Sequence, residues 1–194
     1  MKKSDWFETE INYLSDNELK NFARYYFNNH VGDWFFESSA SSSGKHHPEI
    51  SKGRGGLVRH TKTAVRFCQD MLRLNSYGYM SREYQDYAIL ALLVHDTCKY
   101  GGQNYDKKNY AQHGPLAAEN VNTAWMDYFN TSCPELLYMA IMSHMGQWSP
   151  EGCKPFTPLD RLVHLCDYIS SRESLDVPEV RKEWTRLVKK WDKG

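Results

Sequence analysis

The chain has 194 residues, 41% of them hydrophobic, and its 24 Lys and Arg residues are balanced by 24 Asp and Glu residues. This length fits one domain with a full core, and the balanced charge excludes a global basic field for bulk nucleic-acid binding. No apolar stretch approaches the roughly 20 residues that span a bilayer, and residues 1–7 lack the apolar segment of a signal peptide. We therefore expect one domain over 1–194, located in the cytoplasm.

Helix signals follow one another along the chain, and no strand-like alternation is sustained. Ser15 to Glu18 has the form of a capping box that opens a helix to about Asn29, the only helix indicated before residue 38. Apolar residues at helical spacing predict further helices over 56–74 and 83–95, the second being the most buried.

The second half continues the same pattern. Pro115 begins a predicted helix to about Phe129, and Ser132 with Glu135 and Thr157 with Asp160 form caps of two more. The segment from Pro178 to Trp191 is amphipathic and should pack on the outside. These elements predict an all-α, single-domain helical bundle.

The five cysteines, an odd number, contain no C-x-x-C pair. Neither a disulfide framework, a disulfide-linked partner nor a zinc ribbon is therefore expected. Cys166 stands beside Asp167 and could be a ligand, but a reduced core residue is the more frequent role of such a cysteine.

Four apolar runs lead directly into a histidine or an aspartate, and an unpaired ionised group there costs several kcal/mol. A shared cation compensates several such groups at once, which predicts a metal site between helices. The candidate ligands are imidazoles and carboxylates: His60, His95, Asp96, His113, His144 and Asp167. This set without thiolate favours manganese or iron, with zinc, cobalt and nickel as alternatives, over calcium or magnesium.

Six protein ligands are more than one catalytic ion with an open coordination position needs. We therefore expect two ions, roughly 3.5 to 4 Å apart. At a helix end, His95 and Asp96 can flank one ion while the carboxylate bridges to a second. His113 and His144 could instead face a substrate. His164 is expected to be a hydrogen-bonded core residue that orients a neighbour or caps a carbonyl.

An ordered series of motifs contains these residues. The segments are His46-His47, GGLVRHT at 55–61, LLVHDTCK at 92–99, AQHG at 111–114, MSHMG at 142–146, SPEGCKPFT at 149–157 and LVHLCD at 162–167. The series resembles the HD superfamily of metal-dependent phosphohydrolases over about residues 46–172. It is most similar to the HD domain of bacterial 3′-to-5′ exoribonucleases that carry an OB-fold, and short standalone members occur in bacteriophages and mobile elements.

The resemblance implies a helical bundle of the HD-domain type; the peripheral C-terminal helix expected over 178–194 lies beyond the residues that it covers. It assigns the ligands to two ions, the first held by His60, His95, Asp96 and Asp167 and the second by His113 and His144. Two departures from the family pattern are that Met145 replaces a second histidine and that no OB-fold precedes the domain.

The chemistry that fits is hydrolysis of a phosphate ester of a nucleotide or short oligonucleotide by a metal-bound hydroxide. Asp96 would hold the metals, and Lys99 would contact phosphate unless it is a solvated lysine at a helix end. We expect the loops at 38–56, 100–112 and 147–156 to surround the opening of the substrate-binding site. Further candidate substrate-binding residues are Lys45, His46, His47, Arg54, Gln147 and Trp148. A merely solvated loop and a packing tryptophan are the competing interpretations.

Two other functions remain open. One is a 3′-to-5′ exonuclease on single-stranded RNA or DNA, with a partner supplying grip, and the other is a non-catalytic nucleotide-binding sensor. The complete ligand set argues against the sensor. With neither an OB-fold nor a basic stripe expected, we favour a small nucleotide substrate over a long strand.

Overall fold

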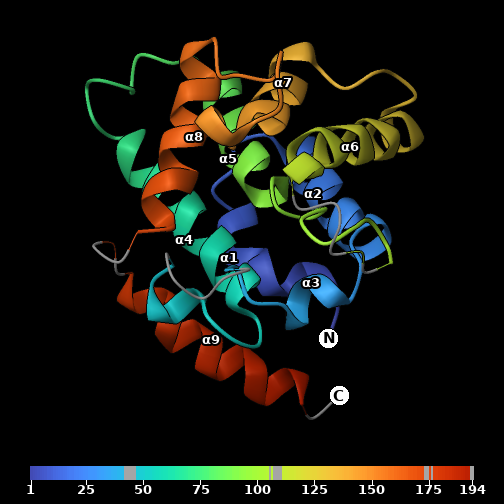
Figure 1. The fold of residues 1–194 in the computed structure, drawn as a ribbon, viewed down its shortest axis with the longest axis vertical. Helices are drawn as coiled ribbons and strands as arrows, with labels where there is room; N and C mark the ends of the chain where they lie inside the picture. Colours follow the sequence, from blue (N-terminus) through green and yellow to red (C-terminus); the bar gives the residue numbers. More distant parts are fainter. Residues whose placement is uncertain (42–46, 105, 107–110, 173–174, 176, 193–194) are drawn as a thin grey trace.

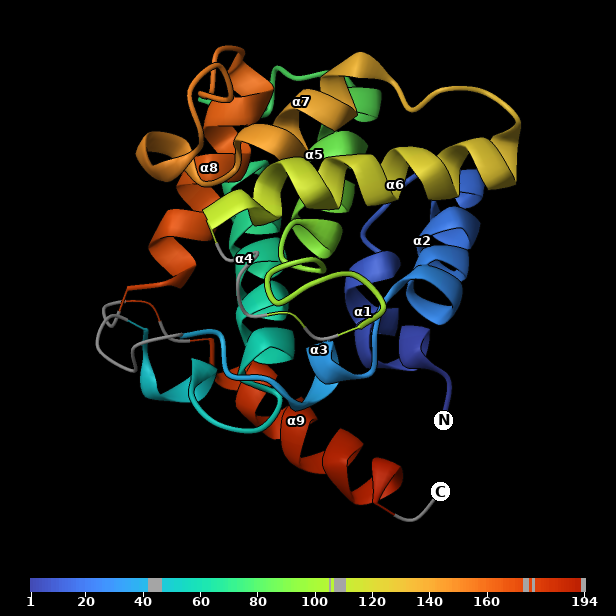
Figure 2. The ribbon, with the colours of Figure 1, turned by 45° about the vertical axis from the view of Figure 1, so that its right-hand side comes forward.

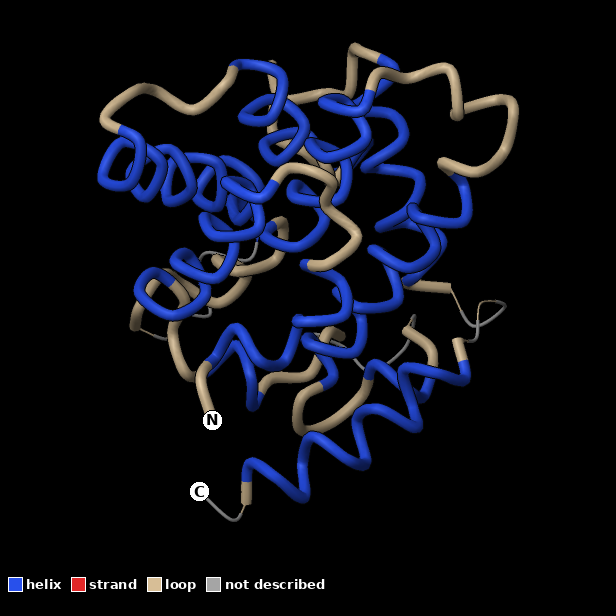
Figure 3. The backbone as a smooth tube through the Cα atoms, turned by 180° about the vertical axis from the view of Figure 1, so that it is seen from behind, coloured by secondary structure: helices blue, strands red, loops and turns tan. Residues whose placement is uncertain are grey.

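A computed structural model describes residues 1–41, 47–104, 106, 111–172, 175 and 177–192. This part of the chain is helical and contains no strand, which confirms the predicted all-α class (Figures 1 and 3). The elements are η1 (Lys3–Phe7), α1 (Glu8–Ile11), α2 (Asn17–His30), α3 (Trp34–Glu37), η2 (Glu49–Ser51), α4 (Gly56–Met71), α5 (Arg82–Val94), α6 (His113–Phe129), α7 (Glu135–Ser143), η4 (Gly146–Trp148), α8 (Pro158–Ser170) and α9 (Pro178–Trp191). Among the described helices, none combines the length and the apolar character that crossing a membrane requires.

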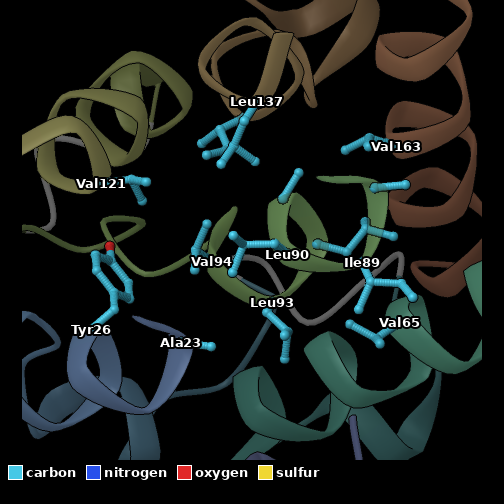
Figure 4. Packing of buried hydrophobic residues seen from close by; sticks show 14 of the residues in the cluster. Ala23, Tyr26, Val65, Ile89, Leu90, Leu93, Val94, Val121, Leu137 and Val163 are labelled. Carbon is cyan, nitrogen blue, oxygen red and sulfur yellow. The ribbon is translucent and has the colours of Figure 1, made fainter. Parts of the chain in front are cut away.

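Helix α5 lies at the centre of the bundle, surrounded by α2, α4, α6, α7 and α8 (Figures 1 and 4). Its residues from Asp86 to Val94 are all buried, as predicted for the most apolar segment. Figure 4 shows Ile89 near Val65 of α4 and Val163 of α8, whereas Val94 points toward Val121 of α6. A helix that is apolar on all sides must be enclosed in this way, because no face of it can be left to water.

Two predicted helix caps are wrong. The N-cap of α2 is Asp16, whose carboxylate accepts hydrogen bonds from the backbone N–H groups of Glu18 and Leu19. Ser15 instead donates its hydroxyl to Asp86 at 2.7 Å, because α5 brings this buried carboxylate against the α2 entry. Helix α7 begins after Pro134, without a side-chain cap, so Ser132 does not cap it.

Other predicted boundaries agree with the structure to within a few residues. The capping box of Thr157 and Asp160 at the start of α8 is confirmed. Helix α4 ends at Met71, three residues before the predicted end, and α6 starts at His113, two residues before Pro115.

The prediction of a single helix before residue 38 is wrong, because η1, α1 and α3 also lie there. These elements are only four or five residues long, too short for a periodic pattern. Aromatic packing holds η1 and α3: the Phe7 ring stacks on Phe27 at 4.5 Å between centroids and lies 6.1 Å from the Phe35 ring.

Helix α9 lies at the same end of the molecule as the N-terminus (Figures 1 and 2). Its Trp184 ring stacks on Trp6 at 5.1 Å between centroids, and its Trp191 ring stacks on Phe36 at 6.2 Å. Gly55 meets the same indole of Trp184. A Cβ at Gly55 would lie 1.8 Å from Trp184, and the residue has a left-handed φ of 66°, so both space and conformation require glycine.

A buried ionic network joins α9 to α1 and α4. Lys62 and Glu10 are both 0% exposed, and the Lys62 ammonium donates to the Glu10 carboxylate at 2.5 Å. Arg66 donates to Glu10 at 2.6 Å and also to Glu183 of α9. Burial opposes the ionised form of Glu183, but Lys62 and Arg66 outweigh it and lower the pKa of that carboxyl. The charges are therefore mutually compensated.

Replacing Glu10 should destabilise the protein strongly. Glu10→Ala removes the 2.5 Å partner of the buried Lys62 and leaves it the longer 3.4 Å pair with Glu183, and breaking such a buried pair costs about 3–5 kcal/mol of unfolding free energy. Urea unfolding at neutral pH measures this loss. The control is Glu8→Ala, which removes the exposed Arg24 pair on the same short helix and should cost about 1 kcal/mol or less. Equal losses for the two variants would contradict the assignment.

Candidate metal centre

The six predicted metal ligands meet in the middle of the bundle. The elements that carry them are α4 for His60, the turn directly after α5 for His95 and Asp96, the first residue of α6 for His113, the C-cap of α7 for His144, and α8 for Asp167. Five of the six are at most 3% exposed, and the Asp167 side chain is 21% exposed. Residues up to 107 positions apart in sequence thus share one buried space.

One group of three consists of His60, His95 and Asp167. The Nε2 atom of His60 lies 2.9 Å from Asp167 Oδ1 and 3.4 Å from His95 Nε2. The Nε2 atom of His95 lies 3.4 Å from the same Asp167 oxygen. The three ligand atoms therefore form a compact triangle.

A second group of three consists of Asp96, His113 and His144. The Nε2 atoms of His113 and His144 are 3.0 Å apart, and Asp96 Oδ1 lies 3.0 Å from His113 and 3.9 Å from His144. The other oxygen of Asp96, Oδ2, is 3.6 Å from the Nε2 atoms of both His60 and His95. Asp96 thus faces both groups with different oxygens, the arrangement expected of a bridging carboxylate.

Hydrogen bonds on the far side of the rings orient three of these imidazoles. His95 Nδ1 donates to the carbonyl of Leu92 and His144 Nδ1 to that of Ile141, each at 2.7 Å. A carbonyl oxygen has two lone pairs, so Ile141 can accept this bond in addition to the one from the backbone N–H of His144. These bonds place the proton on Nδ1 and leave the Nε2 lone pair directed inward.

Ser170 performs the same function for His60. Its hydroxyl donates to the carbonyl of Asp167 at 2.7 Å, so its oxygen is left to accept from His60 Nδ1 at 3.2 Å. Sequence patterns did not single out Ser170, because a serine near a helix end is ordinarily unremarkable. Its position three residues after Asp167, on nearly the same helix face, is the only sequence signal for it.

The electrostatics of the cluster keep the carboxylates ionised. Burial opposes ionisation of Asp96, but Lys99, His95 and His113 outweigh it and hold its pKa well below the usual value. Burial likewise opposes ionisation of Asp167, but the neighbouring His60 and His95 outweigh it and hold the pKa of this carboxyl well below its usual value. Burial, reinforced by His113 and His95, lowers the pKa of His144 to about 3, so its imidazole stays neutral.

The donor atoms fit a pair of divalent cations. For metal–ligand bonds of about 2.1 Å, the ligand atoms of one tetrahedral or octahedral ion lie roughly 3.0–3.4 Å apart. The first group matches this spacing at 2.9–3.4 Å, and the second matches it except for the 3.9 Å between Asp96 and His144. Inward-facing lone pairs and two ionised carboxylates in a buried space could therefore hold such cations.

Lys99 is not a solvated lysine. It is 5% exposed, and its ammonium lies 2.8 Å from Asp96 Oδ2. Helix α5 has ended at Val94, so the turn of residues 95–100 rather than a helix face brings the two groups together. Thr97 steadies this turn, since its hydroxyl bonds to the carbonyl of Val94 and to the Tyr26 hydroxyl, both at 2.7 Å.

The substrate-binding candidates of the 45–54 loop separate into three cases. Lys45 and His46 lie outside the described residues. His47 lies beside the centre, with its ring 5.5 Å from that of His60, and its buried Nδ1 has no hydrogen-bond partner among the described residues. Arg54 points elsewhere: its guanidinium binds Glu37 at 2.6 Å and Asp192 at 3.2 Å.

Arg59, which the motifs did not single out, holds this loop in place. Its guanidinium donates to the carbonyls of Ile50, of Lys52 at 2.7 Å and of Arg54 at 2.9 Å. It also lies 4.3 Å from the ring centre of Trp184 in α9. The loop that carries His47 is therefore attached to both α4 and α9.

Gln147 and Trp148 lie in η4, directly after the α7 end that carries His144. Trp148 is 54% exposed, and one face of its indole stacks on Tyr168 at 6.0 Å between centroids. Gln147 is exposed as well, and its backbone carbonyl accepts from Lys154 at 2.7 Å. Both side chains remain accessible to a ligand.

His164 and the cysteines behave as predicted. His164 Nδ1 donates to the carbonyl of His144 at 2.8 Å, which confirms its carbonyl-capping role. Cys166 is buried in the core. The cysteines form no disulfide, and Cys153 is the partly exposed one among them.

Comparisons of the chain with known protein families, with curated proteins and with solved structures find no match.

Metal content tests the arrangement directly. Wild-type protein reconstituted with manganese, iron or zinc should contain about two equivalents. Because Asp96 faces both groups, Asp96→Ala should lose most of both, whereas His60→Ala and His144→Ala should each lose one. Elemental analysis measures the content, with His30→Ala as the matched histidine control, since His30 bonds to Tyr25 at the end of α2. Less than a tenth of an equivalent in wild type, or unchanged content in all three variants, would refute the assignment.

Proposed function

We propose that this protein is a metal-dependent phosphohydrolase of the HD superfamily that acts on a phosphate ester of a nucleotide or short oligonucleotide. The observation that carries the proposal is the pair of three-ligand groups linked through the two oxygens of Asp96. Paired divalent ions are a common means of phosphate ester hydrolysis. The order of the motifs along the chain supports the same family.

When bound, divalent ions would lower the pKa of a coordinated water and offset charge on the phosphoryl oxygens. Residues of the chain hold the candidate ligand atoms in the ionisation state and orientation that such ions would require. Asp96 stays ionised and faces both groups, while backbone carbonyls and Ser170 hold three imidazoles with Nε2 inward. Lys99 adds a buried positive charge beside Asp96 that can bind a phosphoryl oxygen.

The proposal that the substrate is a nucleotide rests on residues that lie near the candidate metal centre but are not among the six candidate ligands. The exposed indole of Trp148 offers a stacking face and the neighbouring Gln147 an amide for hydrogen bonds to a base. His47 offers, beside the candidate metal centre, a ring nitrogen that has no hydrogen-bond partner among the described residues. A protein that only senses a nucleotide would not need both the two groups of candidate metal ligands and a buried lysine beside the Asp96 carboxylate.

Activity against a panel of phosphate esters tests the function. With manganese present, the protein should hydrolyse at least one mononucleotide, cyclic nucleotide or short oligonucleotide, and Asp167→Ala should abolish turnover. Phosphate release and chromatography of products measure the result. Processive digestion of long RNA with no turnover of any small ester would overturn the proposal and favour the exonuclease. Binding of nucleotide by metal-loaded protein without turnover would favour the sensor.

Asp96 and Lys99 should differ in their contributions to turnover. Asp96→Ala should remove activity completely, because both ligand groups lose their shared carboxylate. Lys99→Ala should lower kcat by about a hundred- to a thousandfold, the usual cost of one transition-state charge contact, while keeping most of the metal. Lys99→Arg should recover part of the rate. Equal, small losses for the two alanine variants would count against this division of roles.

A further inference from the structure

The outward face of α9 carries a basic stripe, although the chain as a whole has equal numbers of acidic and basic residues. We define the stripe as the exposed residues Arg181, Lys182, Arg186, Lys189 and Lys190. At about 100° per residue they occupy one half of the helix circumference. The sequence interpretation expected no basic stripe, and the structure corrects it by showing which side of α9 faces water.

The opposite face of α9 packs against the rest of the protein. Val180 is buried, and Trp184, Leu187, Val188 and Trp191 pack against the core. Glu183 points inward as well, where it pairs with Arg66 and Lys62. The helix is therefore attached to the core through these residues, and its basic side chains face outward.

Four of the five stripe residues lack a carboxylate partner within the described residues, although the exposed Glu179 lies on the same half of the helix. Lys182, Arg186, Lys189 and Lys190 make no ion pair with a carboxylate in the part of the chain that the structure describes. Like charges three and four residues apart destabilise a helix by a few tenths of a kcal/mol per pair. Lys189 and Lys190 gain something from the helix C-terminus, but Lys182 and Arg186 lie too far from it. An anionic partner would relieve this repulsion.

The stripe has the dimensions of a phosphate backbone. Lys182 and Lys189 are separated by about 10 Å along the helix, at roughly 1.5 Å per residue. That length corresponds to about three phosphates at the roughly 3.4 Å axial spacing of one nucleic-acid strand. A shallow hollow of about 470 Å³ lies over the same residues, lined by Lys182, Thr185, Arg186, Lys189 and Lys190.

We propose that the basic stripe of α9 binds the phosphate backbone of a nucleic acid strand, without selecting bases. A membrane surface is the less favoured partner, because the apolar side of α9, which would have to enter the lipid, is packed in the core. The surface contains none of the metal ligands, so this binding is separate from the proposed hydrolysis. The stripe would provide the electrostatic attraction to a nucleic acid strand that the balanced net charge of the chain does not provide.

Fluorescence anisotropy with a labelled single-stranded oligonucleotide of about ten nucleotides tests the proposal on the full chain at low salt. Wild-type protein should bind with an affinity that falls with salt, with a log–log slope near −2 for about three phosphate contacts. Lys182→Glu combined with Lys189→Glu should weaken binding at least tenfold and flatten the slope. Lys182→Gln combined with Lys189→Gln, which only removes the two charges, should show a smaller loss in the same direction.

The matched control is Arg82→Glu combined with Arg161→Glu, two exposed arginines on α5 and α8. It changes the net charge by the same amount and should bind nearly as well as wild type. Equal losses in the control and the stripe variant would show a net-charge effect and overturn the proposal. So would no binding by wild type, or binding only to vesicles that contain phosphatidylserine. Metal content and mononucleotide turnover should be unchanged in the stripe variant, so failure here is distinct from failure of the proposed hydrolysis.

Discussion

The ionised carboxylate of Asp96, 2% exposed at the centre of the bundle, is the constraint on which the site depends. An unpaired carboxylate at this depth would be strongly destabilising. The neighbouring segments therefore supply groups that compensate its charge. Lys99 contacts one oxygen and His113 the other, while His60 and His95 lie slightly farther away. The helices pack in the way that lets these groups meet, and the candidate metal ligands are among the groups that make burial of Asp96 tolerable.

The periphery is connected to this centre through Arg59. Its guanidinium joins Trp184 of α9 to three carbonyls of the loop that follows His47. Gly55, which leaves room for the same indole, lies at the end of that loop. The peripheral helix therefore both supports the loop beside the candidate metal centre and presents a charged surface outward, and it can do both because its two faces have opposite chemistry.

The sequence predicted much of the fold where a pattern was long enough to be distinctive. The continuous apolar run of α5 and the Thr157 capping box of α8 identified their helices correctly. Single-turn elements such as α1 and α3 could not be predicted, because four residues do not establish a period. Ser15 was predicted to cap α2 on local pattern, but it bonds to Asp86, a residue 71 positions away.

For the site, the sequence alone determined the set of buried imidazoles and carboxylates, because an ionisable group that directly follows an apolar run is buried with it and needs a compensating partner. It did not determine how the six ligands divide, that Lys99 is buried against Asp96, or that Ser170 orients His60. The side of α9 that faces water was also decided by packing. These features depend on distances between residues far apart in the chain, and such distances exist only once the helices have packed around α5.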